Sequence, residues 1–261
     1  MSLAENDLAD LRYAKSLLEN PGLAAKISNL LGTTIGKGFE LLPVKSYDLI
    51  LKIAKESLQK ALDFALKTMD DRSAPRSSDR THKILAAATG AGGGAFGISA
   101  LAVELPISTT IMLRSIADIA RSEGEQIRAI EAKLACLEVF ALGGRSHRDD
   151  GSETGYFFVR TALAKTVSDA AQYITRKGLG EKSAPAIVRL IAAVAARFGV
   201  VVSEKAAAQA VPLIGAAGGA LINTVFIDHF QNMARGHFIV RRLERTYGSE
   251  MVKEAYDKLR V

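Results

Sequence analysis

The sequence predicts an all-α fold, a single multi-helical domain of roughly nine to eleven helices. Apolar residues recur at helical spacing along most of the 261 residues, and the only strand-like run is the three valines at 200–202. Glycine and proline fall between the periodic stretches, where they stop helices. We expect two Gly/Ala-rich apolar helical hairpins to pack at the centre of the domain.

Start and stop signals divide the chain into an N-terminal helical segment, 1–42, and a main helical domain, 43–261. Ser2 and Glu5 form a capping box before the first periodic run. The helices are expected at 3–20, 23–31, 43–69, 107–122, 125–142, 156–175, 185–198, 228–247 and 249–259. The connections are expected at glycines 32, 36 and 38, in a polar linker at 70–79 and in a hydrophilic loop at 143–155.

Composition excludes several classes of protein. Apolar residues make up 48% and charged residues 24%, as in ordinary globular proteins. The single cysteine, Cys136, excludes a disulfide framework and a cysteine-based zinc site. With no Trp and 6% aromatic residues, the chain lacks a stacking platform, so we expect no nucleic-acid partner. A net charge of +6 permits an anionic partner without requiring one.

The N-terminus has neither a basic region nor an apolar region of the secretory type. The prediction is therefore a cytoplasmic protein, with a peripheral position on the inner face of the membrane as the alternative. The oligomeric state is left open.

Two charge-free runs, 84–103 and 206–227, carry the strongest functional signal. A helix of 20 residues is about 30 Å long, which matches a bilayer core. High Gly and Ala content weakens that match because these residues add little insertion energy. Three interpretations of the runs stay open: a buried hairpin, a hairpin that inserts reversibly into lipid, and a permanent membrane span. Residues 104–106 are expected to end the first run. The predicted lipid or membrane contacts are Phe96, Ile98, Leu101, Leu213, Ile214 and Leu221.

Sequence motifs for cofactors and metals are weak. Residues 92–97 fit G-x-G-x-x-G, but Pro106 falls inside the helix that a dinucleotide site would need, and no later strands appear. Residues 32–38 are one residue short of a P-loop. The four histidines lack the usual spacing of metal ligands. The sequence therefore predicts neither a cofactor nor a metal site.

Several polar residues lie close to apolar stretches, Glu138 and Asn223 among them, and four others are considered as a site. Arg114 and Asp118 are one helical turn apart, as in an ion pair or a polar site in a groove. Asp228 and His229 directly follow the second run, where a buried, satisfied polar pair is the plainer interpretation. These four are the only candidate catalytic residues. The basic residues near the C-terminus, which face solvent or anionic lipid, are Arg241, Arg242, Arg245, Lys253 and Lys258.

Three strings resemble the EcsC protein family: ELPISTTIMLRSIADIAR at 104–121, CLEVFALGG at 136–144 and FIDHFQNMARGHFIVRRLE at 226–244. The resemblance covers about residues 48–247. It implies a bacterial helical protein with a link to the envelope or to secretion, and it assigns no catalytic residue. A looser analogy joins the two apolar runs to Gly-rich helical domains that associate with lipid.

The leading functional hypothesis is non-enzymatic association with lipid or with the cytoplasmic membrane through the Gly/Ala-rich helices. The first alternative is a soluble enzyme of unknown reaction, with a site near Arg114, Asp118, Asp228 and His229. The second alternative is an accessory protein of a membrane transport complex, with a membrane protein as its partner. The sequence does not choose a ligand.

Overall fold

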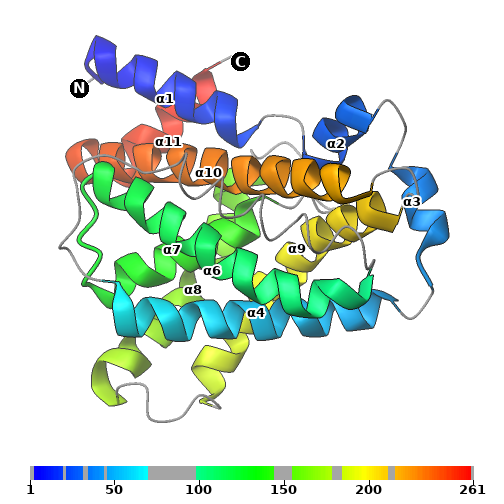
Figure 1. Cartoon of the computed structure of the whole chain (residues 1–261). Coiled ribbons are helices and arrows are strands. Elements are labelled where there is room, and N and C mark those ends of the chain that lie inside the picture. The colour runs from blue at the N-terminus through cyan, green and yellow to red at the C-terminus, as the bar shows by residue number, and fades with distance from the viewer. Residues whose placement is uncertain are drawn as a thin grey trace.

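The computed structural model describes residues 3–19, 22–31, 35–43, 46–69, 98–143, 155–177, 184–210 and 215–259. Within these ranges the chain forms ten α-helices and no strand, which confirms the predicted all-α fold (Figure 1). The helices are α1 (Glu5–Leu18), α2 (Leu23–Leu31), α3 (Gly36–Leu41), α4 (Ser46–Thr68), α6 (Ile98–Ser122), α7 (Ile130–Leu142), α8 (Gly155–Lys177), α9 (Pro185–Ala210), α10 (Gly215–Tyr247) and α11 (Ser249–Lys258).

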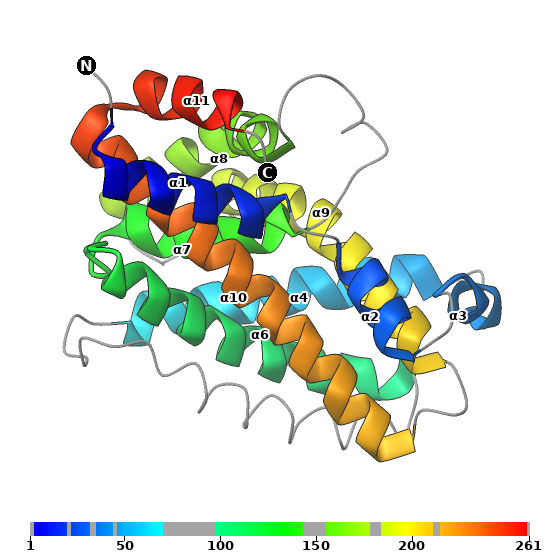
Figure 2. The ribbon, with the colours of Figure 1, turned by 90° about the horizontal axis from the view of Figure 1, so that it is seen from above.

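Two long helices, α9 and α10, organise the core. In Figure 1, α10 runs along the upper side and α4 along the lower side, and α6 crosses between them in front. Figure 2 shows α8 and α11 on the side opposite α6. Where α7, α9 and α10 meet, four aromatic rings fill the interior with centroids 5.0 to 6.2 Å apart. These rings belong to Phe140, Phe198, Phe226 and Phe230.

The N-terminus of α1 differs from its prediction. The N-cap is Ala4, which makes no side-chain cap bond, so the capping box predicted at Ser2 and Glu5 is wrong. The Tyr247 hydroxyl replaces the cap: it accepts a bond from the Ala4 amide at 3.3 Å and donates to Asp7 at 2.6 Å. A residue 243 positions away in the sequence thus supplies what a local side chain usually supplies.

Two glycines predicted in a loop lie in α3 instead. Gly36 begins this helix, and Gly38 faces α9. A Cβ on Gly38 would stand 2.1 Å from the carbonyl oxygen of Ala207, so only glycine allows the two backbones to approach this closely. The loop predicted at these two residues is wrong because glycine serves close helix packing here.

The helix end predicted at 104–106 is also wrong, because α6 runs through Pro106. Proline leaves the carbonyl of the residue four positions earlier, Ala102, without its helical partner. Ala102 is exposed, so water can satisfy that carbonyl. The three valines at 200–202, the strand-like run of the sequence, lie within α9.

The helix predicted from Glu125 begins five residues later, at Ile130. Gly124, with φ of 81°, ends α6 in a Schellman motif. Its amide donates to the carbonyl of Arg121, and the Glu125 amide donates to the carbonyl of Ala120, both at 3.0 Å. The reversal leaves the Glu125 side chain beside α10, where it meets two arginines.

Much of the two apolar runs falls outside the described residues. Residues 84–97 of the first run are not described, and 98–103 form the start of α6. The second run is divided between the end of α9 and the start of α10, with 211–214 outside the description. The two central hairpins therefore stay a prediction.

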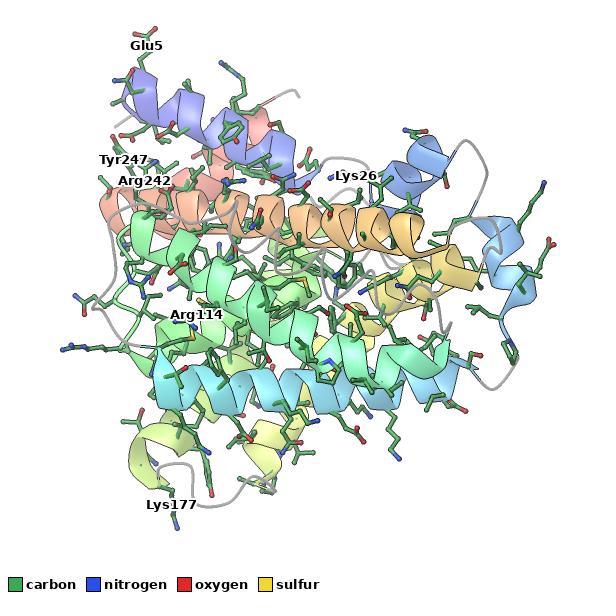
Figure 3. All side chains as sticks on the ribbon, viewed as in Figure 1. Glu5, Lys26, Arg114, Lys177, Arg242 and Tyr247 are labelled. Carbon is green, nitrogen blue, oxygen red and sulfur yellow. The ribbon has the colours of Figure 1, made fainter. Side chains whose placement is uncertain are left out.

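The N-terminal helix closes over the C-terminal helix. The buried ammonium of Lys15 donates to the carbonyls of Tyr256 at 2.9 Å and Leu259 at 2.8 Å, at the C-terminal end of α11. A cation there satisfies carbonyls that lack helical partners and complements the helix dipole. Figure 3 shows Arg242 and Tyr247 of α10 close beneath α1. The Arg242 guanidinium donates to Asp10 of α1 at 2.6 Å.

Gly236 permits α1 to dock on α10. A Cβ at this position would stand 2.6 Å from Cγ of Leu18 and 3.0 Å from the carbonyl oxygen of Ala14. We expect Gly236→Val to lower the free energy of unfolding by about 2 kcal/mol, because the extra volume must push α1 away. Urea unfolding measures the loss. The control is Gly22→Val, since nothing lies within 4 Å of that position, and equal losses in the two variants would contradict the close-docking explanation.

Candidate functional sites

The four predicted polar residues point toward different elements. The Arg114 guanidinium on α6 is exposed and lies 5.9 Å from the ring centroid of Phe64 on α4. Asp118 pairs with Arg121 at 2.7 Å. Figure 3 shows Arg114 at mid-height above α4, and Lys26, which interacts electrostatically with Asp228, higher up beside α2.

His229 is buried and bonded to the backbone. Its Nε2 lies 2.9 Å from the carbonyl oxygen of Gly143, so Nε2 carries the proton and donates. Burial lowers the pKa of His229 to about 4, although the bond to Gly143 opposes the shift. His229 is therefore a neutral imidazole at pH 7. The contacts described for these four residues do not gather them into one pocket.

The six predicted lipid contacts differ in whether the structure describes them and in how exposed they are. Phe96, Leu213 and Ile214 lie outside the described residues, as does the side chain of Ile98. Leu101 is only 1% exposed and belongs to the core, whereas Leu221 on α10 is 44% exposed.

An apolar groove adjoins the predicted lipid contacts on α6. Its volume is about 590 Å³, and α4 contributes one residue to it. Val103 and Ile107, one turn apart on α6, expose 69% and 47% of their surface along it. We call this the α6 groove, and its lining is Lys60, Ala102, Val103, Pro106, Ile107, Thr110 and Ile111.

A buried ion pair joins α6, α9 and α10. The ammonium of Lys205, fully buried, donates to both carboxylate oxygens of Glu104 at 2.9 and 2.8 Å and to Oδ1 of Asn223 at 2.7 Å. Nζ also lies 4.5 Å from the ring centroid of Phe226. Three acceptors match the three donors of an ammonium group, so this arrangement fits charged lysine although burial by itself lowers the pKa of Lys205. All three polar side chains are buried, so the cluster is structural.

A polar pocket opens on the opposite side, between α8 and α11. It has a volume of about 380 Å³, and its floor is formed by α7 and α10. We call it the α8–α11 pocket, and its lining is Glu138, Phe157, Arg160, Thr161, Ala164, Val167, Arg241, Glu244, Ser249, Glu250 and Lys253. Its lining brings together a buried charge from α7, partly buried charges from α8 and α10, and exposed charges from α11.

Glu138 is the unusual member of this pocket. It belongs to α7, where every residue from 132 to 141 is buried, and it is 6% exposed. Within the described residues its carboxylate has no hydrogen-bond partner. Burial raises the pKa of Glu138 to about 7, against the opposing charges of Arg160 and Arg241 and with a smaller contribution from Glu244. This carboxyl group can take up or release a proton near neutral pH.

The arginines beside Glu138 are already paired. Arg160 makes a two-pronged bond to Glu244, at 2.8 and 2.9 Å. Arg241 makes a similar bond to Glu125, at 2.8 and 3.3 Å. Burial raises the pKa of Glu125, but the bonds and charges of Arg241 and Arg245 overcome this effect and hold that pKa below its ordinary value. Arg160 is thus paired with Glu244, whereas Arg241 shares the Glu125 carboxylate with Arg245.

A tyrosine and a histidine extend the network behind the pocket. The Tyr156 hydroxyl accepts a bond from Arg160 at 3.3 Å and forms a second hydrogen bond with Nδ1 of His237 at 3.0 Å. Nε2 of His237 is buried without a partner in the described chain. Burial, aided by the charges of Arg160 and Arg241, keeps the pKa of His237 well below its usual value.

The basic residues near the C-terminus do not form an unpaired cationic face. Arg241 and Arg245 bind Glu125, and Arg242 binds Glu123 as well as Asp10. Lys253 and Lys258 each pair with an acidic residue one turn away on α11.

Sequence reasoning did not identify Lys205 or the α8–α11 pocket. The available signal for Lys205 was a lysine next to Glu204, between the valines at 200–202 and the alanines at 206–208. Glu138 carried a similar signal, a carboxylate inside the apolar run CLEVFA. A charged residue at such a position can serve stability or function, and only its contacts in the folded protein distinguish the two roles.

Comparison with known proteins places most of the chain in one family. The model of the EcsC protein family matches residues 20–243. No curated protein and no solved structure matches the chain.

Proposed function

This chain belongs to the EcsC protein family, and we propose that it is a non-enzymatic protein that associates with lipid at the inner face of the cytoplasmic membrane. The α6 groove carries the proposal. On one face of α6, Val103 exposes most of its surface and Ile107 exposes nearly half. They lie beside a groove large enough for part of an acyl chain. Full burial of such a side chain contributes about 1.5–3 kcal/mol, so the exposed parts of these two would contribute about 1–2 kcal/mol each in lipid.

Charge at the α6 groove favours an anionic amphiphile. Among the described lining residues, Lys60 is the only charged one, and its side chain is exposed. A basic residue near an anionic membrane surface contributes about 1 kcal/mol. The occupant we propose is therefore an anionic phospholipid, with its acyl chain along Val103 and Ile107 and its headgroup near Lys60.

Peripheral association is the form of membrane contact that the packing of α9 favours. In the described residues, α9 is the one helix long and apolar enough to cross a membrane, with mean hydropathy 2.0. However, 56% of that apolar window is buried against other helices, and core helices of water-soluble proteins pass the same test. Its lysine at 205 is held in a three-helix ion pair.

Vesicle binding tests the proposal. We expect the protein to float with phosphatidylglycerol vesicles and to bind phosphatidylcholine vesicles more weakly. The double variant Val103→Asp/Ile107→Asp should lose at least about tenfold in affinity, because two apolar contacts become charged. The matched control is Phe158→Asp/Val188→Asp, which alters side chains that are 44% and 50% exposed outside the groove.

Failure of the wild-type protein to bind either vesicle would overturn the proposal, as would equal binding by the two double variants. Retention on native membranes without binding to protein-free vesicles would instead favour a membrane-protein partner at the groove. That outcome corresponds to an accessory role in a transport complex.

A further inference from the structure

We propose that the α8–α11 pocket binds a small primary amine in its ammonium form, with the Glu138 carboxylate as the counter-ion. This inference is independent of lipid association at the α6 groove, since the two sites share no residue. The pocket volume of about 380 Å³ suits a small molecule.

The first argument is the state of Glu138 without a ligand. Its carboxylate lines the pocket, is 6% exposed and has no hydrogen-bond donor within the described chain. A buried carboxylate without donors is costly, so native proteins normally pair it. A ligand that brings N–H donors and a positive charge supplies what this side chain lacks.

The second argument is the charge balance of the pocket walls. Arg160 is paired with Glu244, and Arg241 is paired with Glu125, in both cases through two bonds. Glu125 also pairs with the exposed Arg245. Lys253 pairs with Asp257. The buried charge left without a partner is therefore negative, and an anionic ligand would meet the carboxylates of Glu138, Glu244 and Glu250.

The remaining lining fits the rest of a small amine. Thr161 and Ser249 place hydroxyl groups on the walls of the pocket, and they can bond a hydroxyl of the ligand. Phe157, Ala164 and Val167 provide apolar surface for carbon atoms. An amino alcohol combines a positive charge for Glu138, a hydroxyl group for Thr161 or Ser249, and carbon atoms for the apolar surface.

The experiment uses three probes of nearly equal size: ethanolamine, ethylene glycol and glycolate. They carry a positive charge, no charge and a negative charge. Binding is followed by NMR chemical-shift changes in the full-length protein. For so small a ligand we expect ethanolamine to bind with a dissociation constant on the order of 1 mM. Ethylene glycol and glycolate should bind at least about tenfold more weakly.

Two variants test the counter-ion. Glu138→Gln preserves the shape of the side chain but removes its charge, and ethanolamine affinity should fall at least about tenfold. Glu131→Gln changes an exposed glutamate on the same helix outside the pocket and should leave binding unchanged. Preferential binding of glycolate, or equal ethanolamine binding by all three proteins, would overturn the assignment.

The pH dependence of binding to the wild-type protein provides a test that needs no variant. The groups that face Glu138 are Arg160 from α8 and Arg241 and Glu244 from α10, with Glu250 and Lys253 of α11 across the pocket. Ethanolamine remains an ammonium ion throughout. Affinity should therefore rise as pH increases toward 7 while Glu138 ionises, and then level off. Affinity that is constant between pH 5 and 8 would exclude Glu138 as the counter-ion.

Free amines and lipid headgroups share this chemistry, and a competition experiment distinguishes them. If the natural source is a headgroup, vesicles of phosphatidylethanolamine should displace free ethanolamine from the wild-type protein, and phosphatidylcholine vesicles should not. If the source is a free amine, neither vesicle should displace it. Absence of ethanolamine binding at tens of times the expected dissociation constant would overturn the proposal for both sources.

Discussion

Replacing Lys205 by methionine is expected to lower the free energy of unfolding by about 3–5 kcal/mol. The substitution preserves most of the side-chain volume but removes the only donor that the described chain offers to the Glu104 carboxylate. That carboxylate is 5% exposed, so it would remain as an unpaired charge in the interior. Urea unfolding monitored by circular dichroism measures the loss.

A second variant shows whether the loss arises from the charge or from packing. The double variant Glu104→Leu/Lys205→Met removes both charges, and most of the lost stability should return because apolar replacements of buried ion pairs are often neutral or stabilising. The matched single control is Lys165→Met on the exposed surface of α8, which should change stability by less than about 0.5 kcal/mol. A Lys205→Met variant as stable as this control would show that the ion pair is not needed.

Glu138 is expected to make the protein less stable as pH rises. Its pKa is raised to about 7 in the folded chain from an ordinary value of 4.5, so the folded state binds the proton more tightly than the unfolded state. The stability that this proton provides is fully present below pH 4.5 and is lost as pH passes through 7. The loss amounts to about 3 kcal/mol.

Comparing wild type with Glu138→Gln isolates this contribution from the opposite effect of the buried histidines. The variant should gain about 3 kcal/mol relative to wild type between pH 4.5 and pH 8. Glu131→Gln, in the exposed first turn of the same helix, should show no such trend. A difference between wild type and Glu138→Gln that does not vary with pH would contradict a raised pKa at this position.

The sequence predicted helix boundaries well where neighbouring residues in the chain determine them. The helix expected at 23–31 is α2, because its boundaries follow from short-range glycine and proline signals. Pro106 indicates a helix end, yet α6 continues through it, and the residue whose carbonyl loses its partner, Ala102, is exposed. Whether a proline stops a helix depends on the surroundings of another residue, and these are set by the tertiary fold.

The candidate sites were harder to predict because their residues meet across the chain. The spacing of Arg114 and Asp118 indicated an ion pair, but Asp118 pairs with Arg121, and Arg114 lies over Phe64. Helix α7 is buried on every side, so no polar face marks Glu138 as the residue that reaches a pocket. The partners of the C-terminal arginines come from segments more than 100 residues earlier.

The contacts of Lys15 have a consequence for the order in which the chain folds. The carbonyls that this lysine binds lie 241 and 244 positions further along, nearly the whole length of the protein. During synthesis from the N-terminus, α1 cannot reach this docking site until α11 has left the ribosome. Contacts with such separation close the longest loop and form late in folding. The seam between α1 and α11 is thus expected to be the last to form and an early place of local opening, which hydrogen exchange of the α1 amides would reveal.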